Sequence, residues 1–195
     1  MHAAFDASPE FDYDPFRTAD EIQRCGTELI FWLEGLAGSD EPPLPDVRLI
    51  RAIHRAWFET TFPADAGCER RAMVVNRKGT AVAWEAILPA VDSACGNWRW
   101  RRENVSPAGG PELVEFIVTE ANTLTVAVYD THPFIDGNTR TAWHLRNYVL
   151  MLDGMRPLGE LVDEKAHERA WWDAMPHDHE LLDQAVLNEL AAAEP

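Results

Sequence analysis

Apolar residues recur at helical spacing along most of this chain. The pattern Thr18-Ala-Asp-Glu21 is a capping box, which predicts a helix running toward Leu36. After Pro45 the apolar positions follow a single helical face, which should end before Pro63. The same spacing predicts further helices over residues 85–95, 111–132, 141–153, 161–174 and 179–193. The expected fold class is therefore mainly α, a helical bundle.

Residues 72–84 break the helical pattern. β-branched residues stand on both sides of an Asn76-Arg-Lys-Gly79 turn, which predicts a β-hairpin. Polar stretches with glycine and proline predict loops over 38–43 and 96–110, and residues 1–16 read as an extended arm. A length of 195 residues predicts a single domain, with a core at 45–160 and C-terminal helices at 161–195.

Composition narrows the class of partner. The formal net charge of −16 would repel a nucleic-acid backbone or an anionic membrane, so neither is expected as a partner. The basic run Arg99-Trp-Arg-Arg102 could hold a phosphate, but such a run is more often a solvated face. The 3 cysteines are odd in number and widely spaced, which argues against a disulfide framework or a zinc site. We expect a cytoplasmic protein, because no segment approaches the roughly 18 apolar residues of a membrane span.

The densest cluster of reactive groups is HPFIDGNTR, residues 132–140, ahead of the predicted helix at 141–153. A helix N-terminus attracts anions, because its first N–H groups lack partners and its dipole is positive. Gly137 lets a phosphate approach the backbone, and Asn138 can cap the helix or bond a phosphate oxygen. Arg140 would bind such an anion, and Asp136 suits a Mg²⁺ shared with phosphate oxygens.

His132 has a near-neutral pKa in its ordinary state, which suits it to take a proton from an attacking hydroxyl. Phe134 is expected to be the apolar anchor that pins this loop to the core. Together these groups favour attack by a hydroxyl on a phosphate linkage. The alternative is structural, with His132 and Asn138 as helix caps and a surface ion pair between Asp136 and Arg140.

This stretch resembles the signature of the Fic (filamentation induced by cAMP) proteins, His-x-Phe-x-(Asp/Glu)-Gly-Asn-Gly-Arg-x-x-Arg. The matching positions are His132, Phe134, Asp136, Gly137, Asn138 and Arg140. Upstream, Ile53-His-Arg55 and Phe62-Pro-Ala-Asp-Ala-Gly67 with Arg70 resemble further family segments, and the predicted hairpin follows them. The resemblance covers residues 45–160.

The resemblance implies the Fic fold, a helical bundle with a small β-hairpin flap. It also implies a transferase that moves AMP from ATP, with Mg²⁺, onto a Tyr, Thr or Ser hydroxyl of a protein. His132 would be the general base, Asp136 the metal ligand, Gly137 and Asn138 the anion hole, and Arg140 a nucleotide-phosphate ligand. The flap would hold a target segment by strand addition, through Val74, Val75, Asn76 and Val82.

Two positions depart from the signature. Thr139 replaces the second glycine, where death-on-curing relatives that transfer phosphate carry Lys, so the transferred group stays open. Its hydroxyl could itself donate to a phosphate oxygen. Trp143 replaces the second arginine, which grips the distal phosphates in AMP-transferring members. Either Arg146, one turn further on, reaches those phosphates, or Trp143 stacks on a flat donor group.

The leading hypothesis is thus a Mg²⁺-dependent nucleotidyltransferase that uses ATP or another nucleotide. One alternative is a Fic-fold transferase with a different phosphate-containing donor or a small-molecule acceptor. Another is a catalytically degenerate, toxin-like binding module with an antitoxin partner. His177-Asp-His179 matches no common metal-ligand spacing. His54 is expected to be packed and hydrogen bonded, and His144 peripheral.

Overall fold

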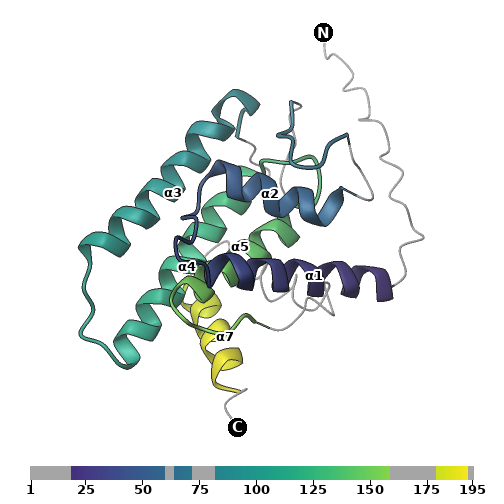
Figure 1. Ribbon diagram of the computed structural model, residues 1–195. Helices are drawn as coiled ribbons and strands as arrows, with labels where there is room; N and C mark the ends of the chain where they lie inside the picture. The colour runs from purple at the N-terminus through teal and green to yellow at the C-terminus, as the bar shows by residue number, and fades with distance from the viewer. Residues whose placement is uncertain (1–18, 60–63, 72–81, 159–178, 193–195) are drawn as a thin grey trace.

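The computed structural model describes residues 19–59, 64–71, 82–158 and 179–192 (Figure 1). Within these ranges every regular element is helical, which confirms the mainly α prediction. The arm at 1–16, most of the predicted hairpin and the predicted helix at 161–174 lie outside the described residues. No helix in the described ranges is both long and apolar enough to cross a membrane.

Helices α1 (Ala19–Ala37) and α2 (Val47–Phe58) form where the capping box and the apolar face predict them. Asp46 caps α2, because its Oδ1 accepts a hydrogen bond from the Leu49 N–H at 2.8 Å. The apolar face of α2 is buried, as expected, and α2 contacts α1, α3 and α5. This cap and this face therefore set where α2 begins and which way it faces.

Helix α3 (Ile87–Asn104) follows a short 3-10 turn, η1 (Trp84–Ala86), and runs far beyond the predicted 85–95. The loop predicted from Gly96 is wrong for residues 96–104, because the buried face of Val91, Cys95 and Trp98 continues across the glycine. A glycine inside a helix costs about 1 kcal/mol. Burial of the Trp98 ring, which is 3% exposed, outweighs that cost.

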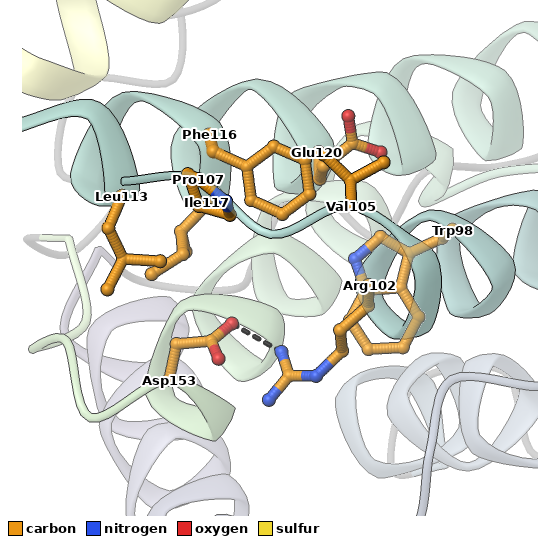
Figure 2. A pocket seen from close by; sticks show the side chains of 9 residues that line it. All are labelled: Trp98, Arg102, Val105, Pro107, Leu113, Phe116, Ile117, Glu120 and Asp153. Atoms are coloured by element: carbon orange, nitrogen blue, oxygen red, sulfur yellow. Dashed lines mark hydrogen bonds and ion pairs between the residues drawn. The ribbon is translucent and has the colours of Figure 1, made fainter. Parts of the chain in front are cut away.

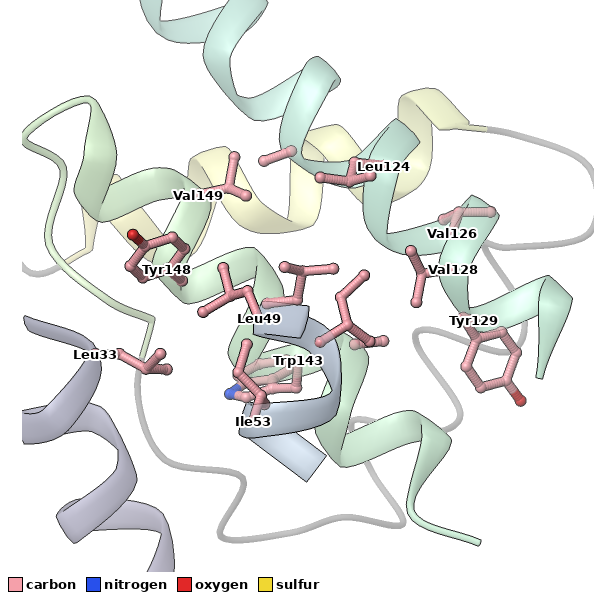
Figure 3. Packing of buried hydrophobic residues seen from close by; sticks show 14 of the residues in the cluster. Leu33, Leu49, Ile53, Leu124, Val126, Val128, Tyr129, Trp143, Tyr148 and Val149 are labelled. Atoms are coloured by element: carbon pink, nitrogen blue, oxygen red, sulfur yellow. The ribbon is translucent and has the colours of Figure 1, made fainter. Parts of the chain in front are cut away.

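Helices α4 (Pro111–Thr131) and α5 (Asn138–Leu152) form the centre of the molecule. Pro111 occupies the first turn of α4, as predicted. Helix α5 begins before the predicted residue 141, because the backbone N–H and the hydroxyl of Thr141 both donate to the Gly137 carbonyl at 2.9 Å. Residues of α1, α2, α4 and α5 share one apolar core (Figure 3).

Helix α7 (His179–Ala191) packs on α4, and a polar link fixes the pair. The Asp183 carboxylate accepts hydrogen bonds from Thr119 Oγ1 at 2.6 Å and from Asn122 Nδ2 at 2.7 Å. Asn122 is completely buried, so these bonds satisfy a side chain that would otherwise be costly to enclose. The C-terminal helix is thereby part of the same core.

Removing the α2 cap should destabilise the protein without changing its core. Asp46→Ala is expected to lower the free energy of unfolding by about 1 kcal/mol, because Leu49 N–H loses its acceptor. Urea unfolding followed by circular dichroism measures the change. Asp46→Asn keeps a capping oxygen and should stay within about 0.5 kcal/mol of wild type. Equal losses in the two variants would rule out the cap as the cause.

Candidate active site

The motif lies in the connection between the end of α4 and the start of α5. His132 directly follows α4 and has φ 51° and ψ 60°, in the left-handed region. It is the one non-glycine residue with positive φ among the described residues. This conformation costs on the order of 1 kcal/mol and recurs at functional sites. Arg70 holds it in place, because Arg70 Nε donates to the His132 carbonyl at 2.6 Å.

Arg70 connects three segments around His132. It is 1% exposed, and its Nη2 donates to the Val82 carbonyl at 2.6 Å and to the Thr131 carbonyl at 3.4 Å. Its backbone N–H donates to the Pro133 carbonyl at 2.9 Å. Val82 directly follows the undescribed part of the predicted flap, so the Arg70 guanidinium joins the motif loop to the first described residue after that part.

His54 of α2 is a second clamp on the motif. Its Nδ1 accepts a hydrogen bond from the Gly67 N–H at 2.8 Å, which leaves the proton on Nε2 to bond the Asp136 carbonyl at 3.1 Å. The ring stacks on Phe58 at 4.7 Å and on Phe134 at 3.8 Å between centroids. Burial lowers the pKa of His54, which favours this neutral form. The packed, hydrogen-bonded role predicted for His54 is confirmed.

The loop also closes on itself through Phe134 and Asn138. Phe134 is 1% exposed, and its backbone N–H and carbonyl both bond the Asn138 carboxamide at 2.9 Å. The expectation that the Asn138 side chain caps α5 is therefore wrong, because Gly137 occupies the cap position and the carboxamide is engaged in the loop. What Asn138 can offer an anion is its backbone N–H at the helix start.

Gly137 is required for two separate reasons. Its φ of 74° is a left-handed conformation that strains other residues. A Cβ at this position would also lie 2.1 Å from Phe58 Cε2, far inside van der Waals contact. The Gly137 N–H donates to Asp136 Oδ1 at 2.6 Å, which orients that carboxylate. Phe58 thus sets how closely α5 approaches α2.

The electrostatics of the site favour a neutral His132. Burial lowers the pKa of the imidazole; the Tyr129 carbonyl raises it, Arg70 lowers it, and the nearby Asp136 and Asp130 carboxylates raise it. The pKa is lowered from its ordinary value, which favours the neutral ring, the form that a general base needs. The charge of the Asp136 carboxylate raises the pKa of the imidazole, so the two groups lie near each other.

Arg140 and Thr139 lie half-exposed in the first turn of α5. Arg140 Cζ lies 5.5 Å from the centroid of the Trp57 ring. His144, one turn further along α5, is 4% exposed, and burial and Arg140 together lower its pKa to about 3. His144, expected to be peripheral, instead lies in the core close to Arg140.

The structure does not bring Trp143 and Arg146 to the start of α5. Trp143 is 2% exposed and lies in the core with Leu49 and Ile53 of α2 (Figure 3). Arg146 is 1% exposed, with Cζ 4.4 Å from the Trp143 ring centroid and Nη1 donating to Asn122 Oδ1 at 3.4 Å. Neither a phosphate contact from Arg146 nor stacking of Trp143 on a donor is open to these enclosed side chains.

The remaining predicted residues divide into two groups. Val82 is half-buried and bonded to Arg70 through its carbonyl. The other predicted flap residues, Val74, Val75 and Asn76, lie outside the described residues, and so does His177. Trp57 and Phe58 contact the motif residues Arg140 and Gly137, although the sequence pattern marks them only as part of the apolar helical face after Pro45. The available signal was their spacing, because both lie one helical turn beyond His54.

Asp136 is suited to bind a metal ion that arrives together with a phosphate ligand. It is less suited to a site in which protein side chains alone hold the metal. In the part of the chain that is described, no three His, Cys, Asp or Glu side chains gather as a metal site. Mg²⁺ in nucleotide sites is commonly held by one or two carboxylates together with substrate phosphates and water. The Asp136 carboxylate, oriented by the Gly137 N–H, matches that pattern.

A cavity of about 220 Å³ lies far from the motif, between α3, α4 and the end of α5 (Figure 2). Its wall includes the paired Arg102 and Asp153, with Trp98 and Phe116 supplying aromatic surface. Asp153 follows the last residue of α5 and Asn138 is the first, a separation of about 20 Å along the helix. The cavity is therefore separate from the candidate active site.

The chain belongs to the Fic/DOC family, whose model matches residues 44–150, more than half of the sequence. This match confirms the resemblance seen in the motif, over nearly the predicted range. No curated protein matches the sequence.

Solved Fic-domain structures have the same fold at low sequence identity. A Fic domain containing signaling protein from Bacteroides thetaiotaomicron has a TM-score of 0.64 and 17% identity, over 88% of this chain and 69% of that chain. BepC from Bartonella tribocorum, with bound AMPPNP, has a TM-score of 0.57 and 15% identity, over 87% of this chain and 86% of that chain. Fic-1 from C. elegans has a TM-score of 0.66 and 19% identity, over 92% of this chain and 51% of that chain. The present chain therefore spans about half the length of the Fic-1 chain.

Gly137→Ala should disrupt the motif more than its backbone conformation alone explains. We expect the free energy of unfolding to fall by about 2 kcal/mol or more, because the added Cβ overlaps Phe58. Gly154→Ala is the matched control, since its φ of 73° is similar and an added Cβ meets nothing within 4 Å. Urea unfolding of both variants separates the two costs. Losses of equal size would mean that Phe58 does not enforce the glycine.

Buried His144 should make the protein less stable in mild acid. Below pH 6.5 the unfolded chain binds a proton at His144 that the folded protein does not accept until about pH 3. Stability contributed by the neutral ring is thus complete above pH 6.5 and is lost as pH falls. Wild type should lose about 1.4 kcal/mol more than His144→Phe between pH 8 and pH 5.5. Parallel stability profiles, measured by urea unfolding, would contradict a buried neutral His144.

Proposed function

We propose that this protein is a Mg²⁺-dependent Fic-type transferase that moves a nucleotidyl group, most simply AMP from ATP, onto a hydroxyl of a protein. Membership of the Fic/DOC family supports a transferase of this general type. The observation that carries the finer proposal is the neutral His132, held in a strained conformation beside Asp136 and the start of α5.

The proposed reaction exchanges one bond to the α-phosphorus of the donor for another. The neutral imidazole of His132 accepts the proton of the acceptor hydroxyl, and the oxygen attacks the α-phosphorus. The bond from that phosphorus to the bridging oxygen breaks, and pyrophosphate leaves with the bonding electrons. The products are the AMP ester of the acceptor and pyrophosphate, with the proton on His132 released afterwards.

The other motif residues bind and orient the donor. Backbone N–H groups at the start of α5, with Gly137 as cap, would bind phosphate oxygens, and Thr139 and Arg140 would add a hydroxyl and a positive charge. Asp136 would hold Mg²⁺ together with the donor phosphates, and the metal would neutralise their charge. BepC, one of the structures with this fold, binds AMPPNP, an analogue of ATP, which supports a nucleotide donor.

The acceptor is proposed to be a protein segment that approaches from the predicted flap. Arg70 bonds both the His132 carbonyl and the Val82 carbonyl, so the end of this segment is tied directly to the proposed base. A target strand paired with residues 74–76 could thereby present its hydroxyl to His132.

A second candidate function is transfer from a donor with fewer phosphates than ATP. It is favoured by the burial of Trp143 and Arg146, since neither α5 side chain is placed to contact distal phosphates. Arg140 would then bind the single anionic group that such a donor presents near His132.

A label-transfer assay tests the proposal. The full chain is incubated with Mg²⁺, cell extract and each of ATP, CTP, GTP and UTP labelled on the α-phosphate. We expect protein labelling that falls about 100-fold or more in His132→Ala, because the general base is lost. Chelation by EDTA and Asp136→Asn should both reduce labelling strongly. Trp100→Ala, at a position 60% exposed on α3, is the control and should label like wild type.

The position of the label separates the alternatives. Labelling from α-labelled but not γ-labelled ATP supports AMP transfer, and the reverse indicates phosphate transfer. No labelling from any nucleotide, or labelling that survives in His132→Ala, would overturn the proposal.

A further inference from the structure

The phosphate-binding arginine of the motif rests on an aromatic ring from another helix. Arg140 Cζ lies 5.5 Å from the centroid of the Trp57 ring, within the range of a cation–π interaction. Trp57 belongs to α2 and Arg140 to α5, so this contact joins two elements that the motif sequence alone does not connect. Trp57 is 4% exposed, and water therefore has little access to the ring.

The ring is fixed in place by its other neighbours. Helix α1 approaches closely at Gly26, where an added Cβ would lie 3.3 Å from Trp57 Cζ3. On the α5 side the Trp57 and His144 rings lie 5.2 Å apart, tilted by 37°. A ring enclosed in this way cannot turn without moving α1 or α5, so it is a rigid surface for the guanidinium.

The neutral state of His144 avoids charge repulsion with Arg140. A protonated His144 would place a second positive charge one helical turn from Arg140, whereas the buried ring is neutral at pH 7. Its Nδ1 has no hydrogen-bond partner in the part of the chain that is described, so no local acceptor stabilises a proton there. The cation thus lies beside two neutral rings.

We propose that Trp57 is a positioning residue for Arg140, and that its indole face holds the guanidinium in the orientation that binds the donor phosphate. The inference rests on the proposed function, since it needs Arg140 to bind that phosphate. A flexible arginine would lose side-chain entropy on binding, and a ring that restrains it beforehand reduces this loss. Trp57 itself, at 4% exposed, offers almost no surface to a donor or an acceptor.

The test is a series of binding and rate measurements with Mg²⁺·ATP as the probe. Trp57→Leu removes the aromatic face and should weaken ATP binding about 3- to 10-fold, with kcat changed much less than KM. Trp57→Phe keeps an aromatic face and should recover most of the affinity. In the Arg140→Ala background, Trp57→Leu should have no further effect on ATP affinity, because the two residues act through one contact.

Fluorinated tryptophan incorporated at position 57 distinguishes loss of the cation–π contact from a folding defect. Fluorine weakens the attraction of the ring for a cation while keeping its shape, so ATP affinity should fall with each added fluorine while the melting temperature holds.

The outcomes separate the two proposals. If wild type binds none of ATP, CTP, GTP and UTP, or Arg140→Ala binds the nucleotide as well as wild type does, the proposed function fails. If Arg140→Ala weakens binding but the leucine and fluorinated variants bind like wild type, only the positioning role of Trp57 fails. An equal loss from Trp57→Leu with and without Arg140 would also overturn it, since the effect would then be general loss of structure.

Discussion

The stacked, neutral ring of His54 is the interaction on which the candidate site depends. It accepts a hydrogen bond from Gly67, donates one to the Asp136 carbonyl, and packs between Phe58 and Phe134. A protonated ring could not accept the first bond, so the arrangement requires burial and neutrality together. Without this clamp, nothing else in the described residues would fix the motif loop to α2 at the Asp136 backbone.

A second feature of the structure is the set of buried neutral imidazoles around the candidate site. His54, His132 and His144 all have lowered pKa values, with burial as the largest cause in each. In the proposed function, these neutral rings would leave the phosphate charge to be met by the start of α5, Arg140 and a metal held by Asp136. They also leave His132 free to accept a proton. The strained backbone of His132, fixed by Arg70, keeps this imidazole at the end of α4.

Much of this architecture could be predicted, and the failures have identifiable causes. Helical periodicity located α1, α2, α4 and α7, because burial of one face repeats along a helix. It misplaced the end of α3, where burial of Trp98 overrides the cost of Gly96. Helical spacing alone predicted that Trp143 or Arg146 could contact a ligand. Spacing gives the angle of a side chain around its own helix, and the packing of α2 and α4 against α5 encloses both.

The order of residues from His132 to Arg140 by itself indicated the family to which the chain belongs and the reactive groups of the candidate site, because those groups are neighbours in one short loop. The tertiary structure alone decided which distant residues control that loop. His54 meets the Asp136 backbone across 82 positions of sequence, and Trp57 meets Arg140 from another helix. Such contacts depend on how helices pack, which the local pattern of polar and apolar residues does not specify.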